Sequence, residues 1–531
     1  MHSLATLGVG LLVLLAAGRL VQHLLKTGNA LGLPPGPKPA PIIGNLFQVP
    51  KSLQWFHFYH WSKNHGPIMH LSMAGQPLII LSTNEAVQEL MNRRGAQYSD
   101  RPRLVMAGEL VTKGMHMLLR PYDERYRLHQ RMEAPLLNPR AANCYRPIQD
   151  LESKQLLFDI FAEVDKSESS DFHHHFQRAM ASTIYSLIYG YRFKTGHEQE
   201  LVDAFHVQAE FARTGQVGAY IVDTLPFLNH LPRALAPWKK EGEALYELER
   251  KLHVGNLETG LRNPGWNWAK YMVDCTEAKG MSTEELAFDL GIMADAALDT
   301  STVALTWLVV AWVVHGSQFI AKAQKLLDEI VGADRMPTFD DRPQLAYIDA
   351  IACETLRWRP VVVGGVPHMT KTEDTFRGYR IPAGSIVMGN AFAITRDESA
   401  FGADVDSFIP ERWIDKDGNL KELPQSGFGF ARRICTGRHI ARNGLFIEIA
   451  RVLWAFDIEE VVTETGEPHI VDDMACTEGF VTCPKPFRVK FRQRGPWVRD
   501  VILAGGSTHI VDHVEILNKA GADRRAKKPG A

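Results

Sequence analysis

The chain has few cysteines for its 531 residues, and their spacing suits neither a zinc site nor a disulfide framework. Both kinds of site need cysteines that recur at short intervals, such as a Cys-x-x-Cys pair. No such pair occurs among the six cysteines, which are Cys144, Cys275, Cys353, Cys435, Cys476 and Cys483. The scattered pattern argues against both classes of site and indicates a reducing compartment.

The chain also lacks a surplus of charge of either sign. Its 59 lysines and arginines nearly balance its 61 acidic residues, which leaves a formal net charge of −2. A protein that binds nucleic acid normally carries a basic surplus, so no nucleic-acid partner is predicted. No internal linker divides the chain, and 45% of its residues are hydrophobic, which is enough for one large core.

One long apolar run lies at the N-terminus, where Leu4 to Leu25 spans 22 residues. This is close to the ~20 residues that a helix needs to cross a bilayer. Positive charges follow the run, which favours an uncleaved anchor over a cleaved signal peptide and keeps the following chain cytosolic. Residues 1–32 are therefore predicted to form a single-pass membrane anchor. Repeated prolines at 33–41 predict a stiff hinge after it.

The clearest long helix is predicted from Ser282 to Gly316. Ser282 with Glu285 forms a capping-box pattern, and Gly316 is a typical stop signal. The apolar middle indicates a core helix, yet Asp299 and Thr300 lie within it. A buried carboxylate is costly, and neither residue favours a helix interior. A functional role for this pair is therefore favoured over a structural one.

The stretch at 428–437, Phe-Gly-Phe-Ala-Arg-Arg-Ile-Cys-Thr-Gly, places Cys435 in a glycine-punctuated loop. An apolar helical pattern follows from about His439 to Trp454. A helix N-terminus, nearby arginine charge and backbone N–H groups all help a thiolate to stay deprotonated. Gly437 lets the backbone pass close to a flat ligand. Cys435 is therefore interpreted as a metal ligand, although a lone cysteine is more often a small core hydrophobe.

This stretch resembles the haem-binding loop of the cytochrome P-450 family, Phe-x-x-Gly-x-Arg-x-Cys-x-Gly. The match covers Phe428, Arg433, Cys435 and Gly437. The resemblance implies that Cys435 is the axial thiolate of a b-type haem and that Arg433 binds a haem propionate. Ala431 stands where the family usually has glycine, which an alanine can replace only at negative φ or by tolerating strain. We expect a tighter loop that keeps its ligand.

Two further motifs carry the resemblance. Glu-x-x-Arg at 354–357 has a spacing that places acid and base on one helix face, and Pro-Glu-Arg-Trp follows at 410–413. Together they resemble the family's network of one glutamate and two arginines, here Glu354, Arg357 and Arg412. A buried network of this kind fixes geometry more than it adds stability.

The resemblance also assigns roles elsewhere in the chain. Asp299 and Thr300 match the family's oxygen-activating acid and alcohol, and His368 matches a position that binds a haem propionate. Tyr126 and Gln130 stand where the family usually has the Trp and Arg that contact a propionate, which puts that contact in doubt.

Three adjacent histidines at 173–175 invite a metal interpretation. Neighbouring side chains on a helix or strand point in different directions. A structural role is therefore expected for them.

The resemblance covers about residues 33–494 and implies a mainly α (α+β) fold, helix-rich with small β-sheets. A small sheet is expected at 67–82 because two short apolar strands flank Gly75. The predicted organisation is an anchor at 1–32, a catalytic domain at 33–495 and a tail of unknown role at 496–531.

The function implied is that of a membrane-bound, fungal-like haem-thiolate monooxygenase in the endoplasmic reticulum membrane, active in specialised-metabolite biosynthesis or xenobiotic oxidation. It would take electrons from NADPH through NADPH-cytochrome P-450 reductase, with cytochrome b5 as an optional second partner. Arg127 and Arg438 are predicted to belong to the surface that meets this reductase. Loops at 101–118 and 361–365, with Phe480, are expected to line an apolar pocket for a small molecule.

Two other classes stay open from the sequence. A haem-thiolate isomerase or dehydratase would need neither dioxygen nor a reductase, and the Asp299–Thr300 pair argues against it. A haem-binding protein without turnover is the further alternative, which is encouraged only by the alanines at 297 and 431, two positions where the family usually has glycine.

Overall fold

The computed structural model describes residues 32–164, 172–216, 218–459, 470–505 and 511–526. The predicted anchor lies outside these residues except for its last position. Within the described chain, α12 (Thr283–Ile330) is the one helix long and apolar enough to cross a membrane, and 67% of its most apolar stretch is buried in the protein. That burial makes α12 a core helix, as its apolar middle predicts.

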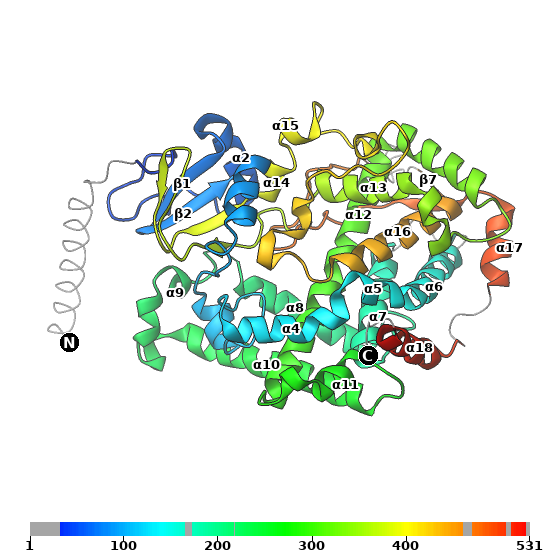
Figure 1. The fold of residues 1–531 in the computed structure, drawn as a ribbon, viewed down its shortest axis with the longest axis horizontal. Helices are drawn as coiled ribbons and strands as arrows, with labels where there is room; N and C mark the ends of the chain where they lie inside the picture. Colours follow the sequence, from blue (N-terminus) through cyan, green and yellow to red (C-terminus); the bar gives the residue numbers. More distant parts are fainter. Residues whose placement is uncertain (1–31, 165–171, 217, 460–469, 506–510, 527–531) are drawn as a thin grey trace. The chain divides into compact units, whose positions relative to one another are not determined.

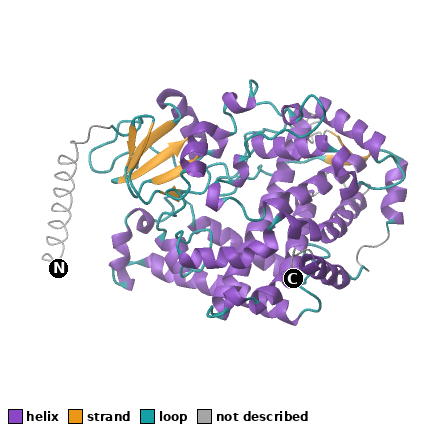
Figure 2. Cartoon of the chain, in the orientation of Figure 1, coloured by secondary structure: helices purple, strands orange, loops and turns teal. Residues whose placement is uncertain are grey.

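The chain divides into two compact units. Of the described residues, the sheet unit contains those within 32–102, 364–397 and 430–432, and the helical unit contains those within 103–363, 398–429 and 433–526. Helices dominate Figure 2 and strands are few, which confirms the predicted mainly α fold with small β-sheets.

The sheet unit is built around a four-stranded sheet of order β1-β2-β6-β3, in which β2 and β6 are parallel and the other pairs antiparallel. The strands of this sheet are β1 (Ile68–Met73), β2 (Gln76–Leu81), β3 (His368–Met369) and β6 (Ile386–Gly389). A separate two-stranded sheet of the unit consists of β4 (Asp374–Phe376) and β5 (Tyr379–Ile381). Its helices are α2 (Gln54–His65), α3 (Asn84–Val87), η1 (Gln88–Arg93) and α14 (Ala391–Ile394).

The sheet expected at 67–82 is the β1–β2 hairpin. Ala74 and Gly75 form its turn with φ values of 51° and 91°, the left-handed pair that a tight hairpin turn requires. Alternate residues of the strands face opposite sides, so Ile79 and Leu81 join one apolar cluster while Leu78 and Ile80 join another. The central strands are therefore buried on both faces.

The helical unit holds most of the chain, and α12 runs through it as the long green helix of Figure 1. Its first elements are η2 (Val105–Val111), α4 (Glu124–Leu137), α5 (Pro139–Cys144), α6 (Arg146–Val164), α7 (Phe172–Tyr189), α8 (Gln199–Thr214), α9 (Ile221–Thr224), η3 (Pro226–His230), η4 (Arg233–Leu235), α10 (Pro237–Arg262), α11 (Trp268–Asp274) and η5 (Thr276–Ala278). After α12 follow η6 (Phe339–Gln344), α13 (Ala346–Trp358), α15 (Glu398–Phe401), η7 (Pro410–Trp413), η8 (Ser426–Phe428), η9 (Ala431–Arg433, which begins in the sheet unit), α16 (Arg438–Ala455), β7 (Phe456–Glu459), β8 (Lys490–Gln493), α17 (Pro496–Ala504) and α18 (His513–Ala526).

The predicted start of α12 agrees with the structure, and its predicted end was wrong. The Ser282 hydroxyl accepts a hydrogen bond from the Glu285 N–H at 3.1 Å, as a helix cap should. The helix continues past Gly316 to Ile330, because Trp312 and Ile320 pack against the glycine and its backbone stays helical. A glycine stops a helix only where the chain turns left-handed.

The C-terminal tail packs against the helical unit. Val498 and Ile502 of α17 are buried, as are Leu517 and Ala520 of α18. The side-chain oxygen of Asn518 accepts a hydrogen bond from the Trp266 N–H at 2.9 Å. These contacts make the described part of the tail an integral part of the core, while the domain boundary at 495 stays a prediction.

Candidate functional site

Cys435 lies in the loop between η8 and α16, and it is the exposed member of the six cysteines. Its backbone N–H donates to the carbonyl oxygen of Phe428 at 2.8 Å, which closes the loop. Burial of the sulfur within the loop raises the pKa of the Cys435 thiol, and the Gly437 N–H and the charge and N–H of Arg438 act against that rise. The residue as a whole is exposed, while protein atoms surround its sulfur, which faces two backbone donors at the start of α16.

The loop fits a flat, thiolate-ligated cofactor. A Cβ added at Gly437 would have only the Cys435 Sγ within 4 Å, at 3.9 Å, so the space beside the sulfur is open. A soft thiolate is the ligand expected for haem iron in a monooxygenase-type site. Among the described residues, no group of three or more His, Cys, Asp or Glu side chains could hold a second metal ion.

Ala431 adopts the left-handed conformation, with φ at 45°. Its N–H donates to the side-chain oxygen of Asn92 at 2.7 Å, which holds it there. An L-residue in this region costs roughly 1–2 kcal/mol. Alanine therefore replaces the family's glycine at this position with a strained backbone, and not by adopting a negative φ.

Arg433 is tied to the segment that precedes α4. Its guanidinium donates to the carbonyl oxygens of Arg120 at 2.6 Å and Met117 at 3.4 Å. It also lies over the Tyr126 ring, 3.8 Å from the ring centre. The Tyr that replaces the family's Trp is thus a cation–π partner for the loop arginine, and the propionate role of Arg433 stays a prediction.

The Glu354 carboxylate is buried completely and receives five hydrogen bonds in the helical unit. Arg357 donates to both oxygens at 2.7 Å, and Arg412 donates to Oε1 at 3.0 Å. The Ile409 N–H and the Trp413 indole add two bonds of 2.8 Å each. The motifs at 354–357 and 410–413 therefore meet in space, and the network ties α13 to η7. Trp413 is a member that the sequence did not reveal.

His368 lies on β3 in the sheet unit and is buried. Its Nδ1 lies 2.6 Å from the carbonyl oxygen of Tyr98. Because a carbonyl only accepts, Nδ1 must carry a hydrogen, and Nε2 can donate to an anion only from the imidazolium form.

Arg101 is a buried cation of the sheet unit, which the sequence did not indicate. Its Nη1 donates to the carbonyl oxygens of Pro367 at 2.7 Å and Val366 at 3.2 Å, just before His368. The antiparallel bridge between Asp100 and Met369 brings the two segments together. No local pattern distinguishes such an arginine from a surface one.

Asp299 and Thr300 lie in the middle of α12, and each is bound to a different neighbour. The Thr300 hydroxyl donates to the carbonyl oxygen of Ala296 at 2.9 Å. Burial raises the pKa of Asp299, and His173 and Gln177 of α7 act against that rise. The carboxyl therefore faces α7, while the hydroxyl is held by the preceding turn of its own helix.

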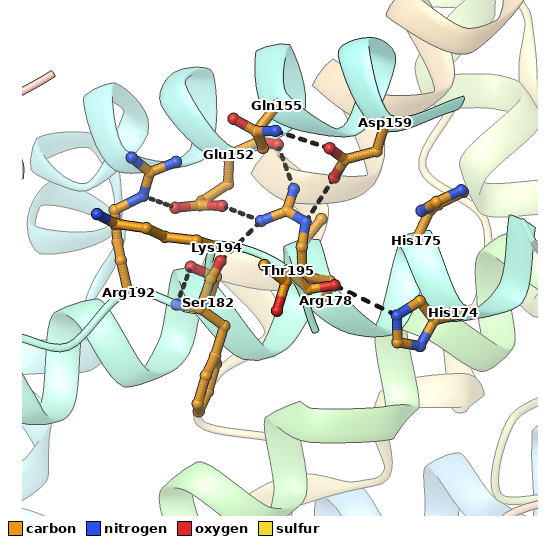
Figure 3. A network of polar contacts seen from close by, with 12 residues as sticks. Glu152, Gln155, Asp159, His174, His175, Arg178, Ser182, Arg192, Lys194 and Thr195 are labelled. Atoms are coloured by element: carbon orange, nitrogen blue, oxygen red, sulfur yellow. Dashed lines mark hydrogen bonds and ion pairs between the residues drawn. The ribbon is translucent and has the colours of Figure 1, made fainter. Parts of the chain in front are cut away.

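The three adjacent histidines of α7 face three different partners. His173 Nδ1 lies 3.0 Å from the Thr306 hydroxyl, and His175 Nε2 lies 3.1 Å from a Glu163 oxygen. Figure 3 shows His174 turned toward Thr195, whose carbonyl oxygen lies 3.4 Å from the ring. The side chains diverge, as expected for neighbours on a helix.

Comparison with known proteins places the chain in a family. The cytochrome P-450 family model matches residues 34–491. A cytochrome P-450 monooxygenase named aneD, from Aspergillus aculeatus, is 38% identical over 480 residues, which are 90% of this chain and 91% of the relative. The monooxygenases drtD from Aspergillus calidoustus and FrzL from a Cladobotryum species are 36% and 34% identical, and each alignment covers at least 93% of both chains.

These matches extend over the loop of Cys435, the helix of Asp299 and Thr300, and the Glu354 network alike. The chain therefore belongs to the cytochrome P-450 family, and it is an oxidoreductase of the monooxygenase type.

Proposed function

We propose that this chain is a haem-thiolate enzyme that inserts one oxygen atom of dioxygen into a small organic molecule. The second oxygen atom leaves as water, with electrons supplied by NADPH through a reductase. The observation that carries the proposal is Cys435, whose thiol faces backbone donors at a helix N-terminus and lies beside the open space at Gly437. Fungal relatives of similar length support a role in specialised metabolism.

Separate residues would hold the haem iron and the haem propionates. Cys435 would bind the haem iron, and the bound haem supplies the oxygen chemistry. Arg433, which belongs to the same unit as Cys435, is the cation suited to hold a haem propionate.

The remaining residues act on protons and on position. The Thr300 hydroxyl and the Asp299 carboxyl would hold and pass protons during the reaction, because they are adjacent polar groups in the middle of the core helix α12. The Glu354 network would keep the chain after α13 in place. The alanine at 431 leaves the thiol loop intact.

Replacement of Cys435 by serine tests the proposal. A neutral hydroxyl is a far weaker iron ligand than a thiolate, so the variant should lose the thiolate signature of the ferrous carbon monoxide spectrum and all reductase-driven turnover. Cys275→Ser is the matched control, because Cys275 is half-buried and lies next to α11. A Cys435→Ser protein with an unchanged spectrum would overturn the assignment.

The need for a reductase distinguishes a monooxygenase from the isomerase alternative. Thr300→Ala should keep the haem spectrum while NADPH electrons are diverted to hydrogen peroxide, because the proton path is broken. An isomerase would convert its substrate without NADPH and would not respond in this way.

The reductase is proposed to meet the chain near α4, where Arg127 and Arg131 are exposed. Arg125 is already paired with Glu285, and Arg438 donates to the Cys435 carbonyl oxygen. Reversal of Arg438 would therefore disturb the thiol as well, and Arg127→Glu is the cleaner variant. It should slow reductase-driven turnover and weaken its salt dependence, with the haem spectrum unchanged. An unchanged rate would place the docking surface elsewhere.

The membrane location is also a proposal. The apolar run from Leu4 to Leu25, with positive charge after it, supports a single-pass anchor in the endoplasmic reticulum membrane and a cytosolic catalytic domain. Removal of residues 1–32 should release the protein into the soluble fraction of a cell lysate. Sedimentation of the shortened chain with membranes would contradict the anchor.

A further inference from the structure

Four titratable side chains come together inside the helical unit, away from the thiol loop. Glu249 and His253 lie on α10, Asp295 lies on α12, and His116 precedes α4. His116, Glu249 and His253 are at most 5% exposed, and the Asp295 side chain is 13% exposed. His253 Nε2 lies 3.6 Å from Asp295 Oδ2. The other two are close enough to feel this pair electrostatically, His116 through His253 and Glu249 through Asp295.

A glycine in the interior of α12 makes room for this cluster. A Cβ at Gly291 of α12 would lie 2.2 Å from Nδ1 of His253, so only glycine lets the imidazole rest against the helix. Glycine in a helix interior is otherwise unfavourable. The Phe288 ring meets His253 edge-on at 5.0 Å, and the Phe211 ring stacks on His116 at 4.4 Å. Both imidazoles are therefore fixed in position.

Five polar atoms of the cluster have no hydrogen-bond partner among the described residues. They are Nδ1 and Nε2 of His116, Nδ1 of His253, Oε1 of Glu249 and Oδ1 of Asp295. Unpaired buried polar atoms are costly, and native proteins seldom gather several of them in one place. The fully bonded Glu354 carboxylate shows what a structural site in this chain looks like. The cluster at α10 and α12 instead resembles a site that a ligand completes.

The charge of the cluster indicates which ligand would complete it. No lysine or arginine of the described ranges forms an ion pair with Glu249 or Asp295, and the basic groups of the cluster are the two imidazoles. Burial raises the pKa of Asp295 to about 8, and burial together with the Asp295 charge raises the pKa of Glu249 to about 9. Burial also lowers the pKa of His253 to about 4 and, with the nearby His253, that of His116 to about 3. The site lacks a positive charge and is rich in acceptors.

We propose that Glu249 and Asp295, with the His116 and His253 imidazoles beside them, bind a protonated amino group of the substrate. An ammonium group has three N–H donors, which match the two carboxyl oxygens and one imidazole nitrogen. Asp295 precedes Asp299 by four residues, which is about 6 Å along the helix. A substrate held at its amine would thus reach along α12 toward the Asp299–Thr300 pair. The inference rests on the proposed oxidation of a small molecule, and it adds a polar anchor to the apolar lining that the sequence suggests.

The test compares two probes of the same shape, 4-phenylbutylamine and 4-phenylbutanol. Equilibrium dialysis against the haem-loaded wild-type protein at pH 9, where the Asp295 and Glu249 carboxyls are at least half ionised and a primary amine is still largely protonated, gives a dissociation constant for each probe. The amine should bind about 10-fold to 100-fold more tightly than the alcohol, which is the effect expected of charge-assisted hydrogen bonds in a buried site. Equal affinity for the two probes would overturn the inference even if no variant could be made.

Variants then locate the preference. Glu249→Gln and Asp295→Asn, which keep the side-chain shape, should each remove most of it. Glu247→Gln on the same helix is the control, because this side chain is 60% exposed and should leave the preference unchanged. A preference that survives both cluster variants would mean that the amine binds elsewhere, such as to the haem iron, and would also overturn the inference.

The ferrous carbon monoxide spectrum separates this failure from failure of the proposed function. A protein that shows the thiolate signature but no amine preference refutes the amine site alone. A protein without that signature refutes the proposed function, whichever probe it prefers.

Discussion

Two buried polar regions of the helical unit differ in one respect, which is whether their charges are paired. In the first, Glu152 of α6 is fully buried and accepts hydrogen bonds from Arg178 and Arg192. Arg178 also binds Asp159 at 2.6 Å, and Figure 3 shows these side chains turned toward one another between α6 and α7. In the second, Glu249 and Asp295 face two neutral imidazoles and no lysine or arginine among the residues described.

The presence or absence of partners for buried polar groups distinguishes a structural site from a binding site. Removal of charge from water costs several kcal/mol per ion, and the fold recovers this only through close, well-aligned partners. The Glu152 network contains its own partners and needs nothing else. The Glu249–Asp295 cluster has acceptor atoms without a donor among the described residues. Removal of a partner should therefore matter for stability in the first region, and removal of an acid should matter for ligand binding in the second.

The largest expected effect comes from breaking the paired region. Arg178→Met leaves Glu152 and Asp159 without their shared cation and should lower the free energy of unfolding by about 3–5 kcal/mol. Urea denaturation of the haem-loaded protein measures this. Arg213→Met, which breaks exposed pairs with Glu210 and Glu241, should cost less than about 1 kcal/mol. Similar losses in the two variants would show that the Glu152 network is not a structural one.

In the unpaired region, removal of an acid should raise the free energy of unfolding, and the size of this gain should depend on pH. The pKa of Glu249 is about 9 in the folded protein against an ordinary value of 4.5, so unfolding releases a proton between these values. The stability that Glu249 contributes is therefore complete below pH 4.5 and is lost as pH rises toward 9. Glu249→Gln cannot release this proton, so it should match wild type near pH 5 and exceed it by about 1–3 kcal/mol at pH 8.

Urea denaturation at the two pH values measures that difference. Glu247→Gln on the same helix should show no such pH dependence, since its carboxyl is exposed. If Glu249→Gln were equally destabilising at both pH values, the carboxyl would be a satisfied structural group.

Gly291→Ala tests how tightly the imidazole of His253 is fixed. The new Cβ would collide with the ring, so we expect a loss of about 1–2 kcal/mol, after the usual gain in helix propensity is subtracted. The preference for an amine over an alcohol should fall with it. Gly255→Ala on α10 is the matched control, because no atom lies within 4 Å of its Cβ position and it should stabilise the protein slightly. Thermal unfolding distinguishes them, and equal shifts would contradict the fixed ring.

The smallest expected effect is a change of stability at Ala431, which lies outside both polar regions and has a strained backbone. Ala431→Gly relieves the left-handed φ of 45° and should stabilise the protein by up to about 1 kcal/mol. Ala209→Gly on the exposed face of α8 should destabilise it by a similar amount, because glycine disfavours a helix. Opposite shifts of the unfolding temperature are expected, and a loss in both variants would show that Ala431 is unstrained.

Local patterns in the sequence predicted several parts of the candidate site. The loop before α16, the Ser282 cap and the β1–β2 hairpin each depend on residues that are neighbours in the chain. The spacing of Glu354 and Arg357 likewise placed both side chains on one helix face, where the structure has them in contact. Such features follow from backbone geometry over a few residues, which sequence periodicity records directly.

Other features could not be read from the sequence because they depend on packing between distant segments. Gly316 looked like a helix stop, yet side chains from its own helix cover it and the helix continues. No local pattern around Arg101 indicated burial, yet carbonyl oxygens near β3 receive its hydrogen bonds in a buried position.

The sequence by itself determined the thiol loop, the long core helix and the family of the protein, since each rests on residue types at fixed short spacings. Only the tertiary structure decided which buried charges have partners. Glu152 and Asp295 are both acids within helical segments, and nothing in their immediate neighbours tells them apart. The physical reason is that the cost of a buried charge depends on what other helices bring to within about 4 Å of it, and a local sequence pattern does not specify those contacts.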